Sequence, residues 1–297
     1  LDTLDALLTP LIDCQPGLGD FDLWISTDSS SKAAALTQAI EQSTLMEWIQ
    51  ALEVRVCANR GRNLGPLLLD LWPQLKSYDL LLHLHGKRSV ESDLGSNWLE
   101  ELLRTLLPNA ATVADLRERF SQDRTLGLVM PQAPELIRPY LNWGNNFEMA
   151  RQLTRLWHPW ELSRQAVLLF PAGMMFWCRP NSLAPLAQLM ASLGELPPEP
   201  LAVDGTSLHA LERLVAHSCE SAQLQWRLLC RQEPTTQSEI VTDLSVWEIK
   251  QDAYLQACSL LAVKARTEHE QRLCAESNLA NCTQQLKELV ASAEPVS

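Results

Sequence analysis

The sequence has no two cysteines in a CxxC arrangement, although eight cysteines are spread along its 297 residues. Zinc ribbons and disulfide scaffolds need their cysteines in tighter clusters, so neither class is expected. We predict reduced, mostly structural thiols, as is typical of cytosolic proteins. The eight are Cys14, Cys57, Cys178, Cys219, Cys230, Cys258, Cys274 and Cys282.

The sequence also lacks long apolar runs and a surplus of positive charge. No run approaches the roughly 20 apolar residues of a membrane-spanning helix, and no signal peptide is recognisable. The 24 Lys and Arg residues are outnumbered by 36 Asp and Glu residues, so the net charge is −12. Because nucleic acid requires a basic binding face, it is not an expected partner. We expect a cytoplasmic protein, either free or peripheral at the inner face of the membrane.

The first part of the sequence alternates between short apolar runs and stretches with helical spacing. Pro10 predicts a limit or kink near the end of a first helix at 1–13, and residues 15–20 have the composition of a turn. Strands alternate with helices after that turn, at 21–27, about 30–52, 54–57, 64–75 and 79–85. This order predicts an α/β fold with a mostly parallel sheet flanked by helices.

The sequence changes character near residue 231. Before it, helices are predicted at 97–107, 110–120, 181–192 and 204–217, and strands at 125–131, 167–170 and 174–179. We therefore predict one domain at 1–230, a polar linker at 231–239 and a helical tail at 240–297. The tail has the spacing of an amphipathic helix or short coiled coil, and segment 240–293 could mediate self-association or partner docking.

The first candidate binding residues form a turn between a predicted strand and a predicted helix. Backbone amides at a helix N-terminus bind anions, and two arginines add charge and fork-shaped donors. The alternative is a solvated turn in which a glycine supplies a positive φ. The residues are Asn59, Arg60, Gly61, Arg62 and Asn63.

A second candidate group stands at the end of the strand predicted at 79–85. His83, His85 and Lys87 are spaced by two, so their side chains share one face. Two imidazoles can bind a metal, but no third ligand is apparent nearby. Anion binding fits better, because an ammonium and a histidine donor can stabilise a diphosphate leaving group. A solvent-facing strand end is the remaining alternative.

A third group of polar residues surrounds the start of the helix predicted at 204–217. Glu199, Asp204 and Glu212 are close in sequence to His209 and Arg213. Asp204 would be either the N-cap of this helix or a general base that accepts the proton of a hydroxyl group.

Together these segments resemble the rhamnan synthesis protein F family of bacterial surface-polysaccharide assembly. The resemblance covers about residues 20–220, and its order and spacing are more specific than any single motif. The matching residues are Asn59-Arg60-Gly61-Arg62, Tyr78-Asp79, His85, Lys87, Ser89, Trp98, Gly127-Leu128-Val129, Pro131, Gly173, Met175-Phe176-Trp177, Arg179-Pro180, Asp204-Gly205-Thr206, His209-Ala210 and Glu212-Arg213.

The resemblance implies a GT-A-like sheet and an inverting glycosyltransferase. It would move L-rhamnose or another deoxyhexose from a nucleoside diphosphate to a growing polysaccharide or a lipid-linked glycan. The segment His85-Gly86-Lys87 falls where metal-dependent enzymes of this fold carry an acidic metal-binding motif. A cation there implies that no metal or other cofactor is required. The family's fold also has a strand ahead of the first helix, and this strand is missing here.

The resemblance also implies roles for individual residues. Asp204 would be the catalytic base, with Glu199 as the alternative. Donor binding falls to Asn59, Arg60, Gly61, Arg62, Asn63, His85, Lys87 and Ser89. Sugar binding falls to Gly173, Phe176, Trp177, His209, Glu212 and Arg213, with the two aromatic rings stacked on a sugar face.

The rival hypothesis is a catalytically silent module that binds glycan or partner proteins. Two departures from the family favour it, namely Asn63 in place of the usual Asp and Met174 in place of Ser. The residues that favour the enzyme are the intact His85, Lys87, Asp204, His209 and Glu212.

Overall fold

A computed structural model describes most of the first 231 residues and little beyond them. The described residues are 3–86, 94–133, 137, 141–157, 162–164, 168–197, 199, 201–202, 204–231 and 238–241, with Glu268, Arg272, Ala275 and Leu279 as isolated positions. The predicted linker and coiled-coil tail therefore lie almost wholly outside the described residues and remain predictions. None of the described helices combines the length and apolar character that a membrane crossing requires.

The described elements alternate between helices and short strands. The N-terminal elements are α1 Leu4–Leu18, β1 Phe21–Thr27, α2 Ser30–Glu41, η1 Thr44–Trp48, β2 Ile49–Val56, η2 Pro66–Asp70, α3 Trp72–Leu75 and β3 Leu81–His83. The following elements are α4 Leu94–Leu106, α5 Ala110–Gln122, β4 Leu126–Pro131, α6 Phe147–Thr154, β5 Phe176–Cys178, α7 Pro180–Ser192, α8 Ser207–Arg213, α9 Val215–Ser221, β6 Gln225–Arg231 and β7 Ser238–Val241.

The strands form two sheets, and their orientations taken together are mixed. The α/β class is confirmed, whereas the prediction of a mostly parallel sheet is wrong. Strands β1 and β2 pair in parallel, and the second sheet has the order β3-β5-β4-β6-β7. Only β4 and β6 are parallel in that second sheet. The reason is a turn at Pro171–Met174, which starts β5 opposite the end of β3, so that Phe176 pairs with His83 and β5 runs back.

The first helix is longer than its prolines predict. It continues through Pro10 and Pro16 to Leu18, where the turn was expected, and Gly19 caps it with a φ of 64°. Burial of its leucines offsets the hydrogen bonds that the prolines remove. A Cβ on Gly17 would lie 2.0 Å from the carbonyl oxygen of Ala110. Glycine is therefore required where α1 meets the start of α5.

The prediction of a helix that extends to Leu52 is also wrong. Helix α2 ends at Glu41, and strand β2 already begins at Ile49. Parallel pairing with β1, for example Ile25 with Val54, overrides the local helical spacing. The strand expected at 167–170 is absent from its described residues, 168–170.

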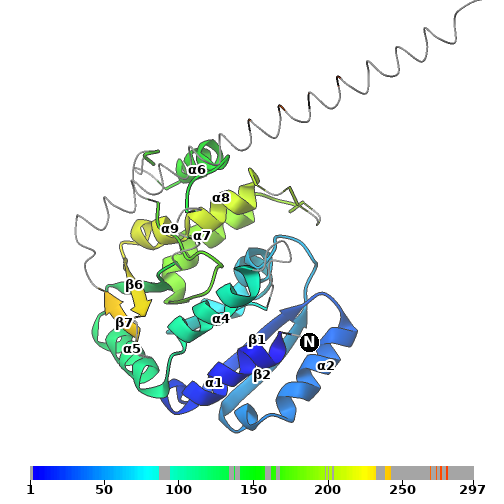
Figure 1. The fold of residues 1–297 in the computed structure, drawn as a ribbon, viewed down its shortest axis with the longest axis vertical. Coiled ribbons are helices and arrows are strands. Elements are labelled where there is room, and N and C mark those ends of the chain that lie inside the picture. Colours follow the sequence, from blue (N-terminus) through cyan, green and yellow to red (C-terminus); the bar gives the residue numbers. More distant parts are fainter. Residues whose placement is uncertain are drawn as a thin grey trace, which may run out of the picture.

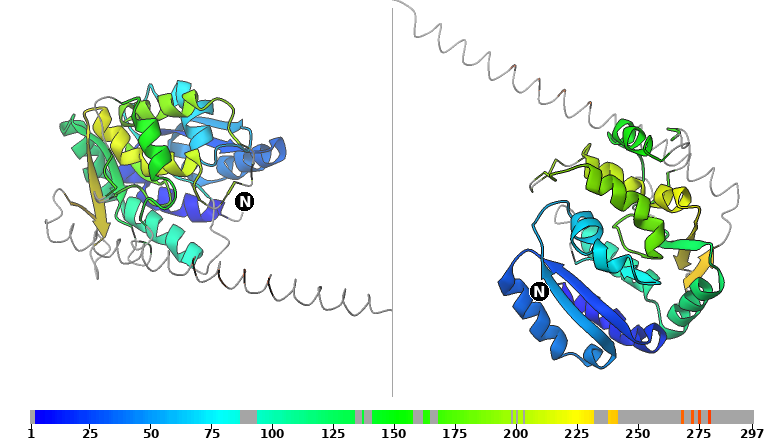
Figure 2. Two further views of the ribbon diagram at one scale, coloured as in Figure 1. Left: turned by 90° about the horizontal axis from the view of Figure 1, so that it is seen from above. Right: turned by 180° about the vertical axis from the view of Figure 1, so that it is seen from behind.

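The five-stranded sheet lies between two apolar cores. Leu128 and Met130 of β4 belong to one core, whereas Val129 belongs to the other, because successive residues of a strand point to opposite faces. Helices α6 to α9 contribute to the first core, and α1, α4 and α5 to the second. Figure 1 and the rear view in Figure 2 show β1, β2, α1 and α2 at one end of the molecule and α6 to α9 at the other.

Candidate functional site

The fold brings the turn at 59–63 against helix α8. Nη1 of Arg62 lies 2.9 Å from Nε2 of His209 and 3.6 Å from Oε1 of Glu212. Because arginine can only donate, Nε2 of His209 accepts, and its proton lies on Nδ1. That proton can be donated to Oγ1 of Thr206, 2.7 Å away. Burial, and then the charge of Arg62, lowers the pKa of His209.

Thr206, and not Asp204, is the N-cap of α8. Its Oγ1 accepts a hydrogen bond from the backbone N–H of His209, and the helix begins at Ser207. The prediction of Asp204 as a cap is therefore wrong, because Gly205, with a φ of 80°, turns the chain between Asp204 and the helix. This turn leaves the Asp204 carboxylate beside the segment 142–146.

Asp204 holds the segment 142–146 onto α8. Its Oδ2 accepts the backbone N–H of Asn145 at 3.0 Å, its Oδ1 accepts the side chain of Asn146, and Arg213 lies 3.6 Å away. Burial acts to raise the pKa of Asp204, but these hydrogen bonds and the arginine charge outweigh it, and the pKa is lowered. Asp204 is therefore ionised, and both of its carboxylate oxygens have partners in the protein.

Arg213 also connects helix α8 to the segment 142–146. Its Nε donates to the carbonyl of Asn142 at 2.8 Å, and its Nη1 donates to the carbonyl of His209 at 2.9 Å. Its guanidinium also stands over the ring of Phe170. The side chain is mostly buried and fixes the backbone around the site.

Glu199 is a carboxylate of which only one oxygen has a hydrogen-bond partner among the described residues. Its Oε2 accepts the N–H of Leu201 at 3.1 Å, whereas Oε1 is buried and has no hydrogen-bond partner among the described residues. Its charge also acts on His209. Nε of Arg62 and Oδ1 of Asn63 are likewise buried without a described partner. Such atoms are uncommon in folded proteins, and each needs an explanation such as a bound water, an ion or a catalytic role.

The other members of the turn at 59–63 do not join this cluster. Arg60 pairs with Glu195 and donates to the carbonyl of Leu196, so its guanidinium is directed to the end of α7. Asn59 is exposed, and Gly61 has a φ of 77°. The turn therefore separates its two arginines, and only Arg62 meets His209 and Glu212.

The two histidines of β3 and its end act as backbone anchors. Nδ1 of His83 donates to the carbonyl of Met174 at 2.6 Å, and Nε2 of His85 contacts the carbonyl of Gly173. Burial, followed by the neighbouring His85, lowers the pKa of His83 to about 3. His83 is therefore neutral.

Two of the predicted donor-binding residues, Lys87 and Ser89, lie outside the described residues. The predicted roles of His85, Lys87 and Ser89 in donor binding remain predictions. Across the part of the chain that the structure describes, no group of three His, Cys, Asp or Glu side chains could hold a metal.

The aromatic pair predicted to stack on a sugar is buried instead. Phe176 is 0% exposed and packs on the ring of His83, and Trp177 is 3% exposed and donates to the carbonyl of Leu106. The stacking prediction is wrong, because β5 is an interior strand whose two faces are both covered. Gly173, with a φ of 85°, shapes the preceding turn against Trp98.

Sequence reasoning missed the asparagine-rich segment Asn142-Trp143-Gly144-Asn145-Asn146. Asn146 is fully buried, donates to the carbonyl of Trp143 and accepts the N–H of Gly205 at 3.1 Å. Three asparagines around one glycine were the available signal, since asparagine side chains often bond to nearby backbone.

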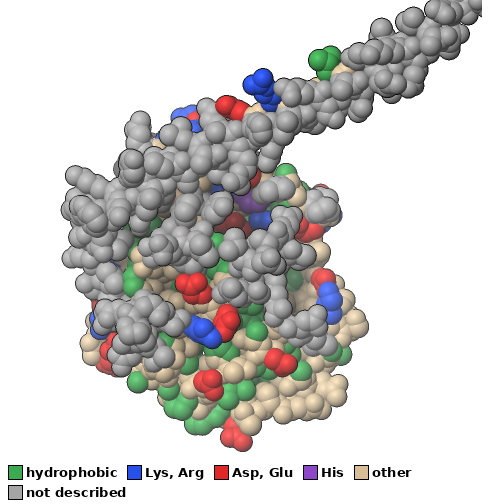
Figure 3. Space-filling model, viewed as in Figure 1, with side chains coloured by type: hydrophobic (Ala, Val, Ile, Leu, Met, Phe, Trp, Pro, Cys, Tyr) green, Lys and Arg blue, Asp and Glu red, His purple; other side chains and the backbone are tan. Residues whose placement is uncertain are grey.

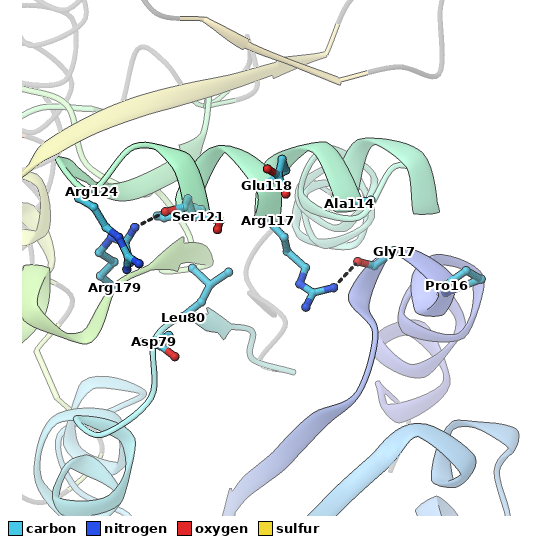
Figure 4. A pocket seen from close by; sticks show the side chains of 11 residues that line it. Pro16, Gly17, Asp79, Leu80, Ala114, Arg117, Glu118, Ser121, Arg124 and Arg179 are labelled. Atoms are coloured by element: carbon cyan, nitrogen blue, oxygen red, sulfur yellow. Dashed lines mark hydrogen bonds between the residues drawn. The ribbon is translucent and has the colours of Figure 1, made fainter.

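A cavity of about 570 Å³ lies elsewhere, between the end of α1, the start of β3 and α5. Figure 4 shows Arg117, Arg124 and Arg179 around it, with Asp79 and Glu118 as the acidic side chains. Arg117 donates to the carbonyl of Gly17, and Arg179 donates to backbone carbonyls of the α5–β4 connection. None of the predicted site residues lines this cavity. On the face shown in Figure 3, acidic and basic side chains are interspersed.

Comparisons with known proteins support the resemblance seen in the sequence. A family model described as rhamnan synthesis protein F matches residues 2–223. Two curated relatives, both called "Uncharacterized protein WxcX" and from two strains of Xanthomonas campestris pv. campestris, are 30% identical over 222 residues. That match covers 72% of this chain and 29% of each relative, so the chain spans less than a third of the length of these relatives. A search of solved structures gave no match.

The family match covers far more than half of the chain and includes every described residue of the Arg62–His209 cluster. The chain therefore belongs to the rhamnan synthesis protein F family.

Proposed function

We propose that this chain is a glycosyltransferase domain that moves a sugar from a nucleoside diphosphate to a growing bacterial polysaccharide. Membership of the rhamnan synthesis protein F family indicates a role in rhamnan or related polysaccharide synthesis. L-rhamnose or another deoxyhexose is the proposed sugar, and a polysaccharide or lipid-linked glycan is the proposed acceptor.

One observation carries the proposal, namely that a cation and a carboxylate whose charges both act on His209 have buried polar atoms without a hydrogen-bond partner among the described residues. Sugar transfer needs a base for the acceptor hydroxyl and positive charge for the leaving diphosphate. Glu199 offers Oε1 for the first task, and Arg62 offers Nε for the second. The charges of both side chains act on the pKa of His209, and Arg62 also contacts its ring, so we propose that the three residues belong to one site.

The contacts favour Glu199 over Asp204 as the base. Asp204 already accepts two N–H groups and faces Arg213, and its lowered pKa makes it a poor proton acceptor. Asp204 is better suited to hold segment 142–146 in place. This reverses the order of the two candidates that the family resemblance implied.

In the proposed reaction, the acceptor oxygen attacks the anomeric carbon as its proton passes to Oε1 of Glu199. The bond between that carbon and the diphosphate oxygen breaks, and the configuration is inverted. Arg62 meets the charge on the departing diphosphate, and Lys87 and His85 are proposed to assist. No metal or other cofactor takes part in this scheme.

The test is a survey of nucleoside diphosphate sugars, including a dTDP-linked rhamnose, with a rhamnose oligosaccharide as acceptor. We expect release of the nucleoside diphosphate together with a product one sugar longer. Calorimetry with UDP, GDP and dTDP measures donor binding separately. Absence of both binding and product across the survey would refute the proposal.

The rival binding module is favoured by the loss of the predicted aromatic platform. With Phe176 and Trp177 buried, no stacking surface from the sequence prediction remains. In that function the cluster around His209 would bind glycan without turnover. Binding of the oligosaccharide acceptor in the same calorimeter, with no nucleotide bound, would identify this second function.

A further inference from the structure

The backbone of Arg62 has a conformation that arginine seldom adopts. Its φ is 54°, and the preceding Gly61 has a φ of 77°. Glycine tolerates this left-handed region, whereas a residue with a Cβ is disfavoured there. Such a residue keeps its conformation only where its surroundings outweigh the strain, and residues of this kind cluster at functional sites. The conformation of Arg62 therefore depends on the partners that hold its side chain.

Two side chains of helix α8 hold the guanidinium of Arg62. Its Nη1 lies 2.9 Å from Nε2 of His209 and 3.6 Å from Oε1 of Glu212. His209 is buried, whereas Arg62 and Glu212 keep part of their side chains exposed. A hydrogen bond weakens steeply when its angle departs from linear, so the bond to His209 sets the direction of the guanidinium.

The ring of His209 can accept this hydrogen bond in only one of its forms. Arginine only donates, so Nε2 carries no proton, and the neutral ring has its proton on Nδ1. Oγ1 of Thr206 lies 2.7 Å from Nδ1 and accepts from it. The same oxygen accepts the backbone N–H of His209 at the start of α8. Thr206 therefore fixes both the ring and the helix that carries it.

We propose that His209 is a positioning residue, which keeps Arg62 in its left-handed conformation and directs the guanidinium toward the diphosphate of the donor. The inference rests on the proposed function, because it takes Arg62 as the group that meets the diphosphate. The hydroxyl of Thr206 selects the tautomer, the tautomer supplies the acceptor, and the acceptor orients Arg62. Binding groups that are fixed before the ligand arrives lose less freedom when it binds.

The neutral ring does what Glu212 alone could not do. A carboxylate beside Arg62 orients it as well, but its negative charge also opposes the approach of a diphosphate. The ring of His209 accepts a hydrogen bond without adding a charge. Arg62 is thus oriented by one partner whose presence leaves the positive charge available to an anion. Its Nε has no hydrogen-bond partner among the described residues.

The experiment separates the roles of the two ring nitrogens in the full chain. His209→Gln puts its amide where Nε2 stands, so it can still accept from Arg62. His209→Asn puts its amide where Nδ1 stands, so it can bond only to Thr206. Thr206→Ser keeps the hydroxyl, and Thr206→Val removes it. His217→Gln and His217→Asn are the matched controls, because His217 lies on α9 and contacts Glu220.

Three measurements are made on the parent and on each variant. Nitrogen-15 NMR without nucleotide reports the tautomer of His209 and the hydrogen exchange of the Nε–H group of Arg62. Calorimetry with UDP, GDP and dTDP reports nucleotide affinity. The thermal midpoint shows whether a variant is folded, and the tautomer of the parent tests the inference even where a variant fails to fold.

We expect the Nδ1–H tautomer of His209 in the parent and in Thr206→Ser, and less of it in Thr206→Val. His209→Asn should speed exchange at Arg62. It should also weaken nucleotide binding by at least about 10-fold, whereas His209→Gln should stay within about threefold of the parent, since one hydrogen bond to a charged group has this value. Both His217 variants should match the parent.

An Nε2–H tautomer in the parent would overturn the inference, and so would equal exchange at Arg62 in His209→Asn and His209→Gln. If the exchange differs as expected but no nucleotide binds to the parent, the positioning of Arg62 stands and the proposed function fails. If nucleotides bind equally to the parent and to both His209 variants, the proposed function stands and the inference fails.

Discussion

Two clusters of polar side chains, one at His83 and His85 and one around His209, contain similar residues but differ in what their side chains bind. His83 and His85 anchor two consecutive carbonyls, and burial keeps His83 neutral. Around His209, by contrast, Arg62 and Glu199 retain buried atoms without described partners. The neutral His83 stabilises a turn through its bond to the carbonyl of Met174, whereas the charged cluster has polar atoms that a ligand can engage. The difference shows that residue type alone does not separate an anchor from a site.

The largest expected effect concerns the anchor and pH. The pKa of His83 falls from 6.5 to about 3 on folding, so the unfolded chain binds a proton first as pH drops. The stability it contributes is therefore complete above pH 6.5 and is lost as pH falls toward 3, by up to about 4–5 kcal/mol. Urea unfolding at pH 7 and pH 4.5 measures the part of this loss that falls above pH 4.5. His83→Gln, which can still donate to Met174, should lose less stability than the parent; an equal loss in both would show that His83 does not titrate as the structure implies.

The next effect concerns the base in the cluster. Glu199→Gln should lower sugar transfer by roughly 100-fold or more, the usual cost of losing a general base. Asp204→Asn should cost less, because the amide oxygen can still accept the N–H of Asn145. Glu195→Gln, an exposed carboxylate nearby, is the matched control. A larger loss from Asp204→Asn than from Glu199→Gln, in protein with the parent's thermal midpoint, would return the base to Asp204.

A smaller effect separates the two arginines of one turn. Arg62→Ala should weaken nucleoside diphosphate binding by about 1.5–3 kcal/mol, the range for hydrogen bonds to charged groups. Arg60→Ala should cost less than about 1 kcal/mol, because Arg60 forms an exposed ion pair with Glu195. Calorimetry on both variants measures the two losses of nucleotide affinity. Equal losses would mean that the whole turn contacts the donor.

The smallest expected effect is that of metal removal. Arg62, with Lys87 as a proposed second cation, can meet the charge of a diphosphate directly. Nucleotide affinity should therefore be the same with EDTA as with added Mg²⁺ or Mn²⁺. Binding that requires either ion would show that carboxylates of the chain ligate a metal.

The sequence was a better guide to which polar residues lie close together than to the residues that surround them in the fold. It singled out Arg62, His209 and Glu212, and the structure brings these three together; it also singled out Glu199, whose charge acts on the pKa of His209. It could not find Asn146, because a buried asparagine differs from a loop asparagine only in what packs around it. It also misjudged Phe176 and Trp177, since β5 is too short to reveal by periodicity that both of its faces are covered.

The sequence by itself determined the α/β class, the strand β1 and the family, because these depend on local periodicity and on the order of motifs. Only the tertiary structure decided the orientation of β5, the path of α1 past two prolines and the separation of Arg60 from Arg62. Each of these depends on contacts between residues far apart in the chain, and burial there outweighs local preference.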